Sequence, residues 1–154
     1  MKILNLGCGP KWKEQYPEYD GLDLIDYGQR WIGDVLDFFN INTYKGQSFT
    51  SQGFGYDEVM ANHFLEHFNQ EELKVIFSNV NRLLKAGGVF KFIVPHLKKE
   101  KAWILSHKTF WNETTINWLE EKEADSVYGL GKWKVKEVIT NARKDIHAIL
   151  KKIP

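Results

Sequence analysis

The sequence has few of the features that mark secreted, membrane-bound or fibrous chains. Its 154 residues include a single cysteine, so an intramolecular disulfide is excluded. No stretch approaches the roughly 18 to 20 apolar residues that span a bilayer, and no apolar signal segment precedes the first glycine turn. The sequence therefore predicts a cytoplasmic protein without a membrane segment.

An excess of charge of one sign is also lacking, because 21 Lys and Arg offset 20 Asp and Glu. A chain that binds nucleic acid nonspecifically or docks on an anionic membrane carries a larger basic excess, so both classes are disfavoured. The charge is uneven, since residues 1–96 hold 9 basic and 12 acidic side chains and residues 97–154 hold 12 and 8. The mildly basic last third favours a small polar or anionic partner molecule.

What is present is the composition of one globular domain, with 43% hydrophobic and 27% charged residues. Short apolar runs that stop at glycine or at an acid predict the first strands of a parallel sheet. Too few residues separate these runs for complete crossover helices, so we expect loops or single helical turns between them. The predicted strands are 2–6, 19–24 and 31–36.

The middle of the chain carries the clearest periodicity. Residues 46–55 have the composition of an exposed loop, and 56–61 form a fourth predicted strand. Asn69 can cap a helix with Glu72, and apolar residues then recur every three or four positions up to residue 84. We expect this helix to end at the Gly87-Gly88 pair, and residues 89–94 to form a buried strand.

The last third predicts two helices, at 99–107 and 112–122, followed by an antiparallel hairpin of strands 133–140 and 145–151. In the middle of the chain, strand 56–61, the long helix after Asn69 and strand 89–94 follow one another and predict a right-handed parallel crossover. The predicted fold class is therefore α/β, a Rossmann-like parallel sheet with a C-terminal antiparallel hairpin and shortened first two crossover helices.

The carboxyl edge of such a sheet is where a ligand binds. The first three predicted strands end there at Gly7 and Gly9, at Asp23, and at Asp34 with Asp37 as a competing acid. Glycine lets a ligand approach the backbone closely, and a carboxylate after the second strand can accept both hydrogen bonds of a ribose diol. This pattern predicts a nucleoside site.

A dinucleotide cofactor fits these residues poorly. Its usual G-x-G-x-x-G loop places a pyrophosphate at the start of a helix, whereas the third glycine is absent here and little room follows Pro10. A nicotinamide-dependent oxidoreductase, which would need such a dinucleotide, nevertheless stays open as an alternative function. A nucleoside without phosphates, such as S-adenosylmethionine, needs only the close backbone approach, the ribose carboxylate and a contact to the adenine.

Six short segments follow one another along the chain: Leu4-Asn5-Leu6-Gly7-Cys8-Gly9-Pro10, Gly21-Leu22-Asp23, Gly33-Asp34-Val35, Tyr56-Asp57-Glu58-Val59, His63-Phe64-Leu65-Glu66-His67 and Leu83-Leu84-Lys85-Ala86-Gly87-Gly88. In this order they resemble the class I S-adenosylmethionine-dependent methyltransferases, in particular the small type 11 variety. The resemblance covers residues 1–96 and thins afterwards, where 106–111 and the final hairpin look like the family's substrate-side insert and closing strands.

The resemblance implies one methyltransferase domain over 1–154, in which 1–96 bind S-adenosylmethionine and 97–154 form the substrate side. The glycine turn would pass under the methionine part, Asp23 would hold the ribose, Asp34 and Val35 would flank the adenine, and Asn62 and His63 would line the methionine side. The cofactor-binding residues that it implies are Leu6, Gly7, Cys8, Gly9, Asp23, Leu24, Asp34, Val35, Asn62 and His63.

Methyl transfer to a hydroxyl or amine needs a group that takes the acceptor's proton, and histidine titrates near neutral pH. His96, directly after the strand that Pro95 closes, is the first candidate, although a loop histidine explains it equally well; His107 is the second candidate. The chain lacks the Asn/Asp-Pro-Pro-aromatic motif of enzymes that methylate nucleic-acid bases. We therefore expect a small polar acceptor, methylated on oxygen or nitrogen.

The pattern His63-x-x-Glu66-His67 also matches the inverted zinc-protease motif. A catalytic zinc needs a third protein ligand and both rings on one helix face, whereas this segment directly follows a strand. The alternative is that Leu65 packs in the core while Glu66 and His67 orient the loop. The sequence therefore predicts no metal centre.

Two further alternatives concern the last third and the sheet faces. Four tryptophans, at 103, 111, 118 and 133, form an acceptor pocket or belong to the core. Missing helical cover on one sheet face favours a homodimer or a partner protein. A non-catalytic S-adenosylmethionine-binding module is therefore the alternative to an enzyme.

Overall fold

The structure is a computed structural model that describes residues 1–41, 48–49 and 54–154. Seven strands form one sheet in the order β3-β2-β1-β4-β5-β7-β6. Strands β1 to β5 are parallel neighbours, and β7 pairs antiparallel with both β5 and β6. The strands are β1 (Ile3–Leu6), β2 (Asp20–Asp23), β3 (Trp31–Ile32), β4 (Tyr56–Asn62), β5 (Leu84–Pro95), β6 (Trp133–Thr140) and β7 (Asp145–Lys152).

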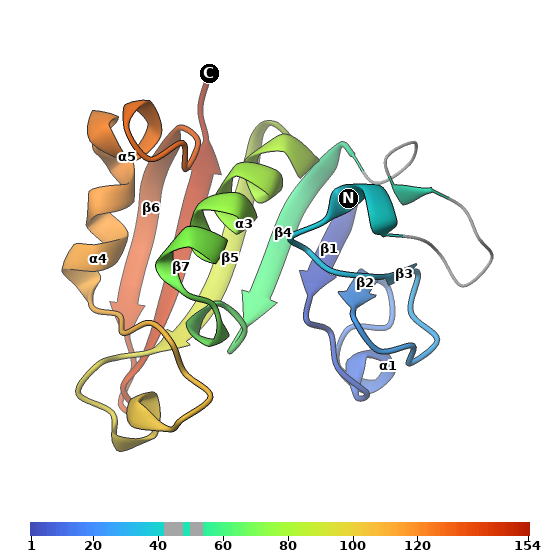
Figure 1. Cartoon of the computed structure of the whole chain (residues 1–154), viewed down its shortest axis with the longest axis horizontal. Coiled ribbons are helices and arrows are strands. Elements are labelled where there is room, and N and C mark those ends of the chain that lie inside the picture. Colours follow the sequence, from blue (N-terminus) through green and yellow to red (C-terminus); the bar gives the residue numbers. More distant parts are fainter. Residues whose placement is uncertain (42–47, 50–53) are drawn as a thin grey trace.

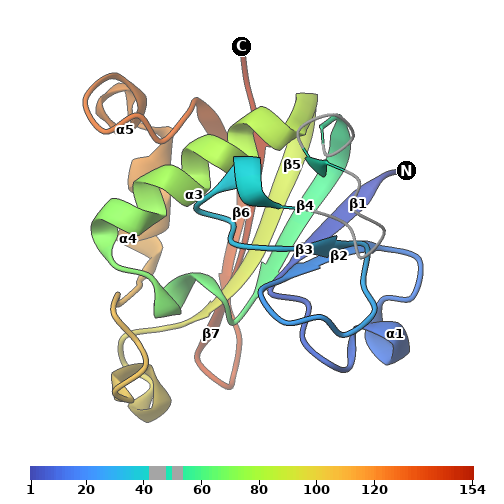
Figure 2. The ribbon, with the colours of Figure 1, turned by 45° about the vertical axis from the view of Figure 1, so that its right-hand side comes forward.

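The longest helix, α3 (Gln70–Leu83), crosses one face of the sheet, and α4 (Glu113–Asn117) and α5 (Lys122–Ser126) lie on the same side beside β6 (Figures 1 and 2). Phe77 of α3 packs edge-on against Phe90 and Phe92 of β5, with ring centroids 5.6 and 6.1 Å apart. This contact places the core between α3 and the sheet. The short helices α1 (Trp12–Gln15), η1 (Phe38–Asn40), η2 (Leu65–His67), η3 (Glu100–Trp103) and η4 (Trp118–Glu120) complete the described elements.

The predicted strand pattern and fold class are confirmed. The first crossover holds one helical turn, α1, and in residues 24–30 the second crossover turns without a helix. The capping box of α3 is present, because the Asn69 side chain accepts from the Glu72 amide at 2.9 Å and Glu72 accepts from the Asn69 amide at 2.8 Å. Most of the loop expected at 46–55 lies outside the described residues.

Two predicted boundaries are wrong. Helix α3 ends at Leu83 with Leu84 already extended, and β5 begins there, so Gly87 does not cap the helix. The φ of Gly87 is +75°, and it lies inside an irregular start of β5 where the register against β4 shifts. The helix expected at 99–107 is only η3, because the backbone is extended again at Ile104.

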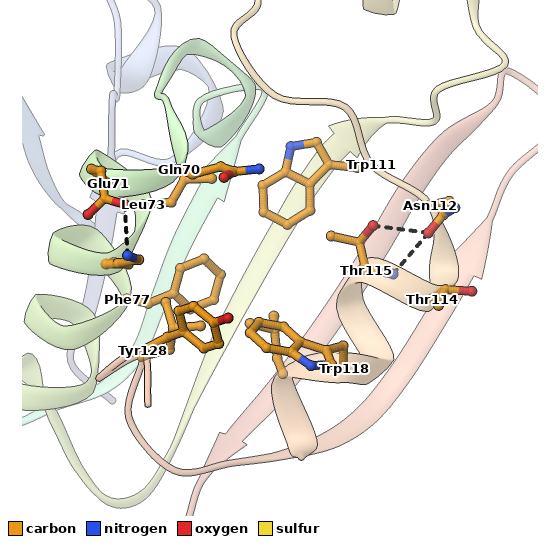
Figure 3. Close-up of a pocket in the computed structure, with 13 residues that line it drawn as sticks. Gln70, Glu71, Leu73, Phe77, Trp111, Asn112, Thr114, Thr115, Trp118 and Tyr128 are labelled. Carbon is orange, nitrogen blue, oxygen red and sulfur yellow. Dashed lines mark hydrogen bonds and ion pairs between the residues drawn. The ribbon is translucent and has the colours of Figure 1, made fainter. Parts of the chain in front are cut away.

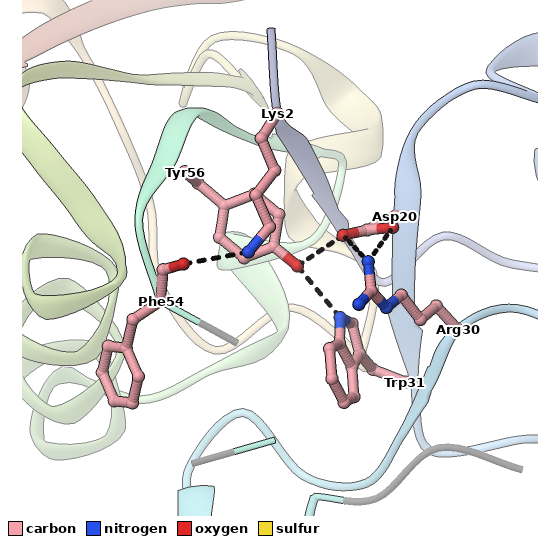
Figure 4. Close-up of polar contacts among 6 residues, drawn as sticks. All are labelled: Lys2, Asp20, Arg30, Trp31, Phe54 and Tyr56. Atoms are coloured by element: carbon pink, nitrogen blue, oxygen red, sulfur yellow. Dashed lines mark hydrogen bonds and ion pairs between the residues drawn. The ribbon is translucent and has the colours of Figure 1, made fainter. Parts of the chain in front are cut away.

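A polar cluster ties the amino-terminal ends of the strands together (Figure 4). The Tyr56 hydroxyl donates to Asp20 at 2.8 Å and accepts from the Trp31 indole N–H at 2.9 Å. Arg30 pairs with the same Asp20 carboxylate at 3.1 Å, and the Lys2 ammonium lies 4.2 Å from the centre of the Tyr56 ring. These contacts join β1, β2, β3 and β4 at the edge opposite the glycine turn.

An ion pair lies on the sheet face away from α3. Because Phe90 and Phe92 point toward α3, Lys91 between them points to the other face, where its ammonium pairs with Glu58 at 2.7 Å. Among the described residues, no helix combines the length and the apolar character needed to cross a membrane.

Candidate cofactor site

The glycine turn after β1 is held against the end of β2. Gly7 and Gly9 have φ of +62° and +66°, a conformation that side chains rarely tolerate. The Gly7 amide donates to the Leu22 carbonyl at 2.9 Å, and the Gly9 amide donates to the Asp23 carboxylate at 3.0 Å. A Cβ on Gly9 would meet nothing within 4 Å, so the backbone there faces open space.

Asp23 sits at the carboxyl end of β2 and is half-buried. One of its oxygens accepts from the Gly9 amide and the other from the Ile25 amide at 3.2 Å. An ionised carboxylate offers about four lone-pair positions. Two therefore stay available for a pair of ligand hydroxyls.

A cavity of about 200 Å³ opens beside this turn. Five of the sequence-predicted cofactor residues line it: Gly7, Asp23, Leu24, Asp34 and Val35. The structure thus brings together the ends of the first three strands, as the nucleoside interpretation requires. Its remaining lining residues are Leu22, Gly33, Leu36, Phe64, Phe68 and Glu72.

Asp34, not its competitor Asp37, lies on this cavity. Asp34 caps its own turn by accepting from the Leu36 amide at 2.8 Å, whereas the Asp37 carboxylate is engaged by the Asn40 side chain. Val35 is fixed through its carbonyl, which accepts from Asn79 of α3 at 2.8 Å.

The other five predicted cofactor residues are absent from the lining of this cavity. Leu6 is fully buried in the core, and Cys8 is buried against Gly21. Burial, with the Asp23 charge adding to it, raises the pKa of the Cys8 thiol to about 12. Asn62 donates to the Tyr16 hydroxyl at 3.3 Å, and His63 has a φ of +50° at the end of β4.

Phe64 covers the place where the methionine part was expected. A Cβ on Gly7 would lie 2.3 Å from the Phe64 ring, which itself packs edge-on against Phe68 at 4.9 Å. Sequence reasoning missed both rings. The available signal was the position of two aromatic residues, four apart, directly after a strand that ends at the ligand-binding edge.

No protein-family model and no curated protein matches this sequence. The fold, in contrast, matches many solved structures. A SAM-dependent methyltransferase from Archaeoglobus fulgidus superposes with a TM-score of 0.64 at 16% identity, over 98% of this chain and 86% of that chain. An S-adenosylmethionine-dependent methyltransferase from Clostridium acetobutylicum gives 0.66 at 14% identity, over 99% and 84%.

The N-methyltransferase NodS from Bradyrhizobium japonicum, in complex with S-adenosyl-l-homocysteine, gives a TM-score of 0.63 at 16% identity, over 98% of this chain and 77% of that chain. This chain has the class I methyltransferase fold. At these identities, the likeness extends to the fold and not to the reaction.

The class I methyltransferase fold places His96 directly after β5, where both its ring nitrogens are engaged. Nδ1 accepts from the Lys98 amide at 3.0 Å, so Nε2 carries the proton that it shares with Glu113 at 3.2 Å. The residue is 7% exposed. This geometry supports a role in holding segment 96–113 more than a role in accepting a proton.

His107 lies beside His67, with ring centroids 4.9 Å apart. Its Nδ1 is 3.1 Å from the Ala102 carbonyl. Since a carbonyl can only accept, Nδ1 carries the hydrogen and Nε2 keeps its lone pair. Of the two predicted bases, His107 is the one with a ring nitrogen suited to take a proton.

A second, larger cavity of about 710 Å³ lies between α3 and α4 (Figure 3). Trp111 and Trp118 line it with Phe77 and Tyr128, whereas Trp133 is buried in the core and Trp103 stacks on Phe110 on the surface. Of the four tryptophans, two therefore line a pocket, one belongs to the core and one lies on the surface. This aromatic cavity shares no lining residue with the cavity at Asp23.

Proposed function

We propose that the chain is an S-adenosylmethionine-dependent methyltransferase that acts on a small polar acceptor. The observation that carries the proposal is the meeting of Gly7, Asp23 and Asp34 around one cavity at the carboxyl edge of the sheet. The four-residue helix α1 behind the glycine turn offers little to a pyrophosphate, which argues against a dinucleotide.

The residues fit an adenosine-containing cofactor, provided that the Phe64 ring moves. Asp23 would hold the ribose hydroxyls, and Asp34 and Val35 would flank the adenine. The cavity, at about 200 Å³, is smaller than the roughly 300 to 1,000 Å³ of typical ligand pockets. Rotation of the Phe64 ring away from Gly7 would open the space for the methionine part.

The cofactor supplies a methyl group that is already electrophilic, so the chain's own work is placement. Holding two reactants in line can lower a barrier by about 7 to 11 kcal/mol in favourable cases. Phe64 and Phe68 would exclude water from the methyl group, and Asn62 and His63 would border it. His107 is the candidate base for the acceptor proton, because its Nε2 keeps a lone pair.

The alternative is an S-adenosylmethionine-binding module without turnover. The Phe64 ring closes the methionine side, which leaves room mainly for the nucleoside. Such a module would bind S-adenosylhomocysteine once the Phe64 ring turns aside, and it would transfer no methyl group.

The test offers the purified protein S-adenosylmethionine with a labelled methyl group and a panel of sugars, small acids and amines. Labelled product with at least one acceptor supports the enzyme. Calorimetric binding without labelled product favours the module, and preference for a nicotinamide dinucleotide in the same titration would overturn both readings. His96→Ala is expected to leave cofactor binding intact, and His107→Ala to lower turnover more than His96→Ala does.

A further inference from the structure

Three potential metal ligands converge outside the cofactor cavity. One ligand atom each from Glu66, His67 and His107 lie within 4.8 Å of one another. Glu66 and His67 belong to η2 after β4, and His107 follows η3 some forty residues later. The two segments are pinned together, because the Lys108 amide donates to the Glu66 carbonyl at 2.8 Å.

Only one of the two oxygens of the Glu66 carboxylate has a polar partner among the described residues. The residue is 1% exposed, and its Oε2 has no hydrogen-bond partner among the described residues. Its Oε1 lies 3.5 Å from Nδ1 of His63. A buried carboxylate oxygen without a partner is costly, so a cation that contacts Oε2 would stabilise the site.

Both histidines use Nδ1 in a hydrogen bond to a backbone carbonyl, which leaves Nε2 for a metal. Nδ1 of His67 lies 3.2 Å from the Ser106 carbonyl, as Nδ1 of His107 lies 3.1 Å from the Ala102 carbonyl. Each Nδ1 therefore donates, and each Nε2 keeps a lone pair. Metal-binding histidines show this arrangement, with the second ring nitrogen donating to a backbone carbonyl and fixing the ring.

We propose that Oε2 of Glu66 and Nε2 of His67 and His107 bind one divalent transition-metal ion of the zinc class. Two imidazoles with a carboxylate suit zinc better than magnesium or calcium, which prefer oxygen ligands. Three protein ligands leave one position for water or a substrate atom, and a metal lowers the pKa of a water bound there.

This site is neither the zinc-protease motif nor the purely structural loop that the pattern His63-x-x-Glu66-His67 suggested. The inverted zinc-protease pattern uses the histidine at 63, but His63 stands in a left-handed turn and pairs with the other oxygen of Glu66. His107, distant in sequence, takes its place. A bound metal uses Nε2 of His107, so that residue then no longer serves as a base.

The experiment uses full-length protein freed of metal with a chelator and requires no S-adenosylmethionine, so its outcome is independent of the proposed function. Zinc is titrated by calorimetry, and Co²⁺ is added as a spectroscopic probe of coordination. We expect one ion per chain and the visible absorption of four-coordinate cobalt. His67→Ala, His107→Ala and Glu66→Gln should each weaken zinc binding by more than the ~10- to 100-fold typical of losing an outer-shell partner.

The matched control is His147→Ala on β7, which removes a histidine that contacts Asn141 and should leave zinc affinity unchanged. Zinc should also raise the melting temperature of the wild type and not that of Glu66→Gln, a readout valid even where a variant is less stable. Absence of stoichiometric zinc binding by the folded wild type would overturn the proposal. Equal weakening by His147→Ala would do the same.

Discussion

The Gly9 amide donates to the Asp23 carboxylate at 3.0 Å, so the turn after β1 and the end of β2 form one unit. The hydrogen bond holds a turn with positive φ, and it orients the carboxylate beside the open space over Gly9. The same residue therefore supports the loop and offers lone pairs to a ligand.

Alanine at the two glycines should have unequal effects. Both replacements force a side chain into the left-handed region, at a cost of roughly 1 to 2 kcal/mol. Gly7→Ala also drives a Cβ to 2.3 Å from the Phe64 ring, whereas Gly9→Ala meets nothing within 4 Å. Urea unfolding should show the larger loss of stability for Gly7→Ala. Equal losses would mean that Phe64 moves freely.

Removing the Phe64 ring should increase the affinity for the cofactor. Phe64→Ala opens the space above Gly7, so binding no longer has to displace the ring. We expect tighter binding of S-adenosylhomocysteine in calorimetry, together with lower stability from lost packing against Phe68. Weaker binding would instead identify the ring as a wall of the site.

The Tyr56 hydroxyl should matter for stability at the opposite edge of the sheet. Tyr56→Phe leaves the buried Trp31 indole N–H without its acceptor, which costs about 1 to 3 kcal/mol. Urea unfolding measures the loss. Tyr128→Phe is the matched control because Tyr128 is exposed, and its change should stay within about 0.5 kcal/mol. Indistinguishable unfolding of the two variants would contradict the role of the cluster.

Cys8 should react slowly with alkylating reagents. Its pKa, raised to about 12 by burial and then by Asp23, leaves a thiolate fraction of about 10⁻⁴ at pH 8, against roughly a quarter for a thiol with a pKa of 8.5. Below pH 12 the rate should rise about tenfold with each pH unit, since only the thiolate reacts. Alkylation of the folded protein at pH 8 as fast as in guanidinium would contradict this.

The sequence predicts what depends on local pattern. Helix α3 follows from its capping box and periodicity, and the β6–β7 hairpin follows from two strand-like runs and a short turn. The end of α3 was misplaced because pairing of Leu84 with Tyr56 of β4 overrides the glycine signal. Tertiary contacts decide that boundary.

The candidate site also contains residues that the sequence could predict and residues that it could not. Asp23 and Asp34 could be predicted, since each ends a predicted strand at the ligand-binding edge. The Phe64 ring over Gly7 could not, because its position depends on the turn at His63 and on packing with Phe68. The meeting of His67 with His107 depends equally on how segment 102–108 folds back onto η2.

The most direct test of the account is calorimetric titration of S-adenosylhomocysteine into the wild type, Asp23→Asn and Asp37→Asn. Asparagine keeps the shape of the side chain but removes its charge, and hydrogen bonds to charged groups contribute about 1.5 to 3 kcal/mol. The account predicts saturable wild-type binding, roughly 10- to 150-fold weaker binding for Asp23→Asn, and no change for Asp37→Asn, which lies off the cavity. Absent wild-type binding, or equal affinity of wild type and Asp23→Asn, would contradict it.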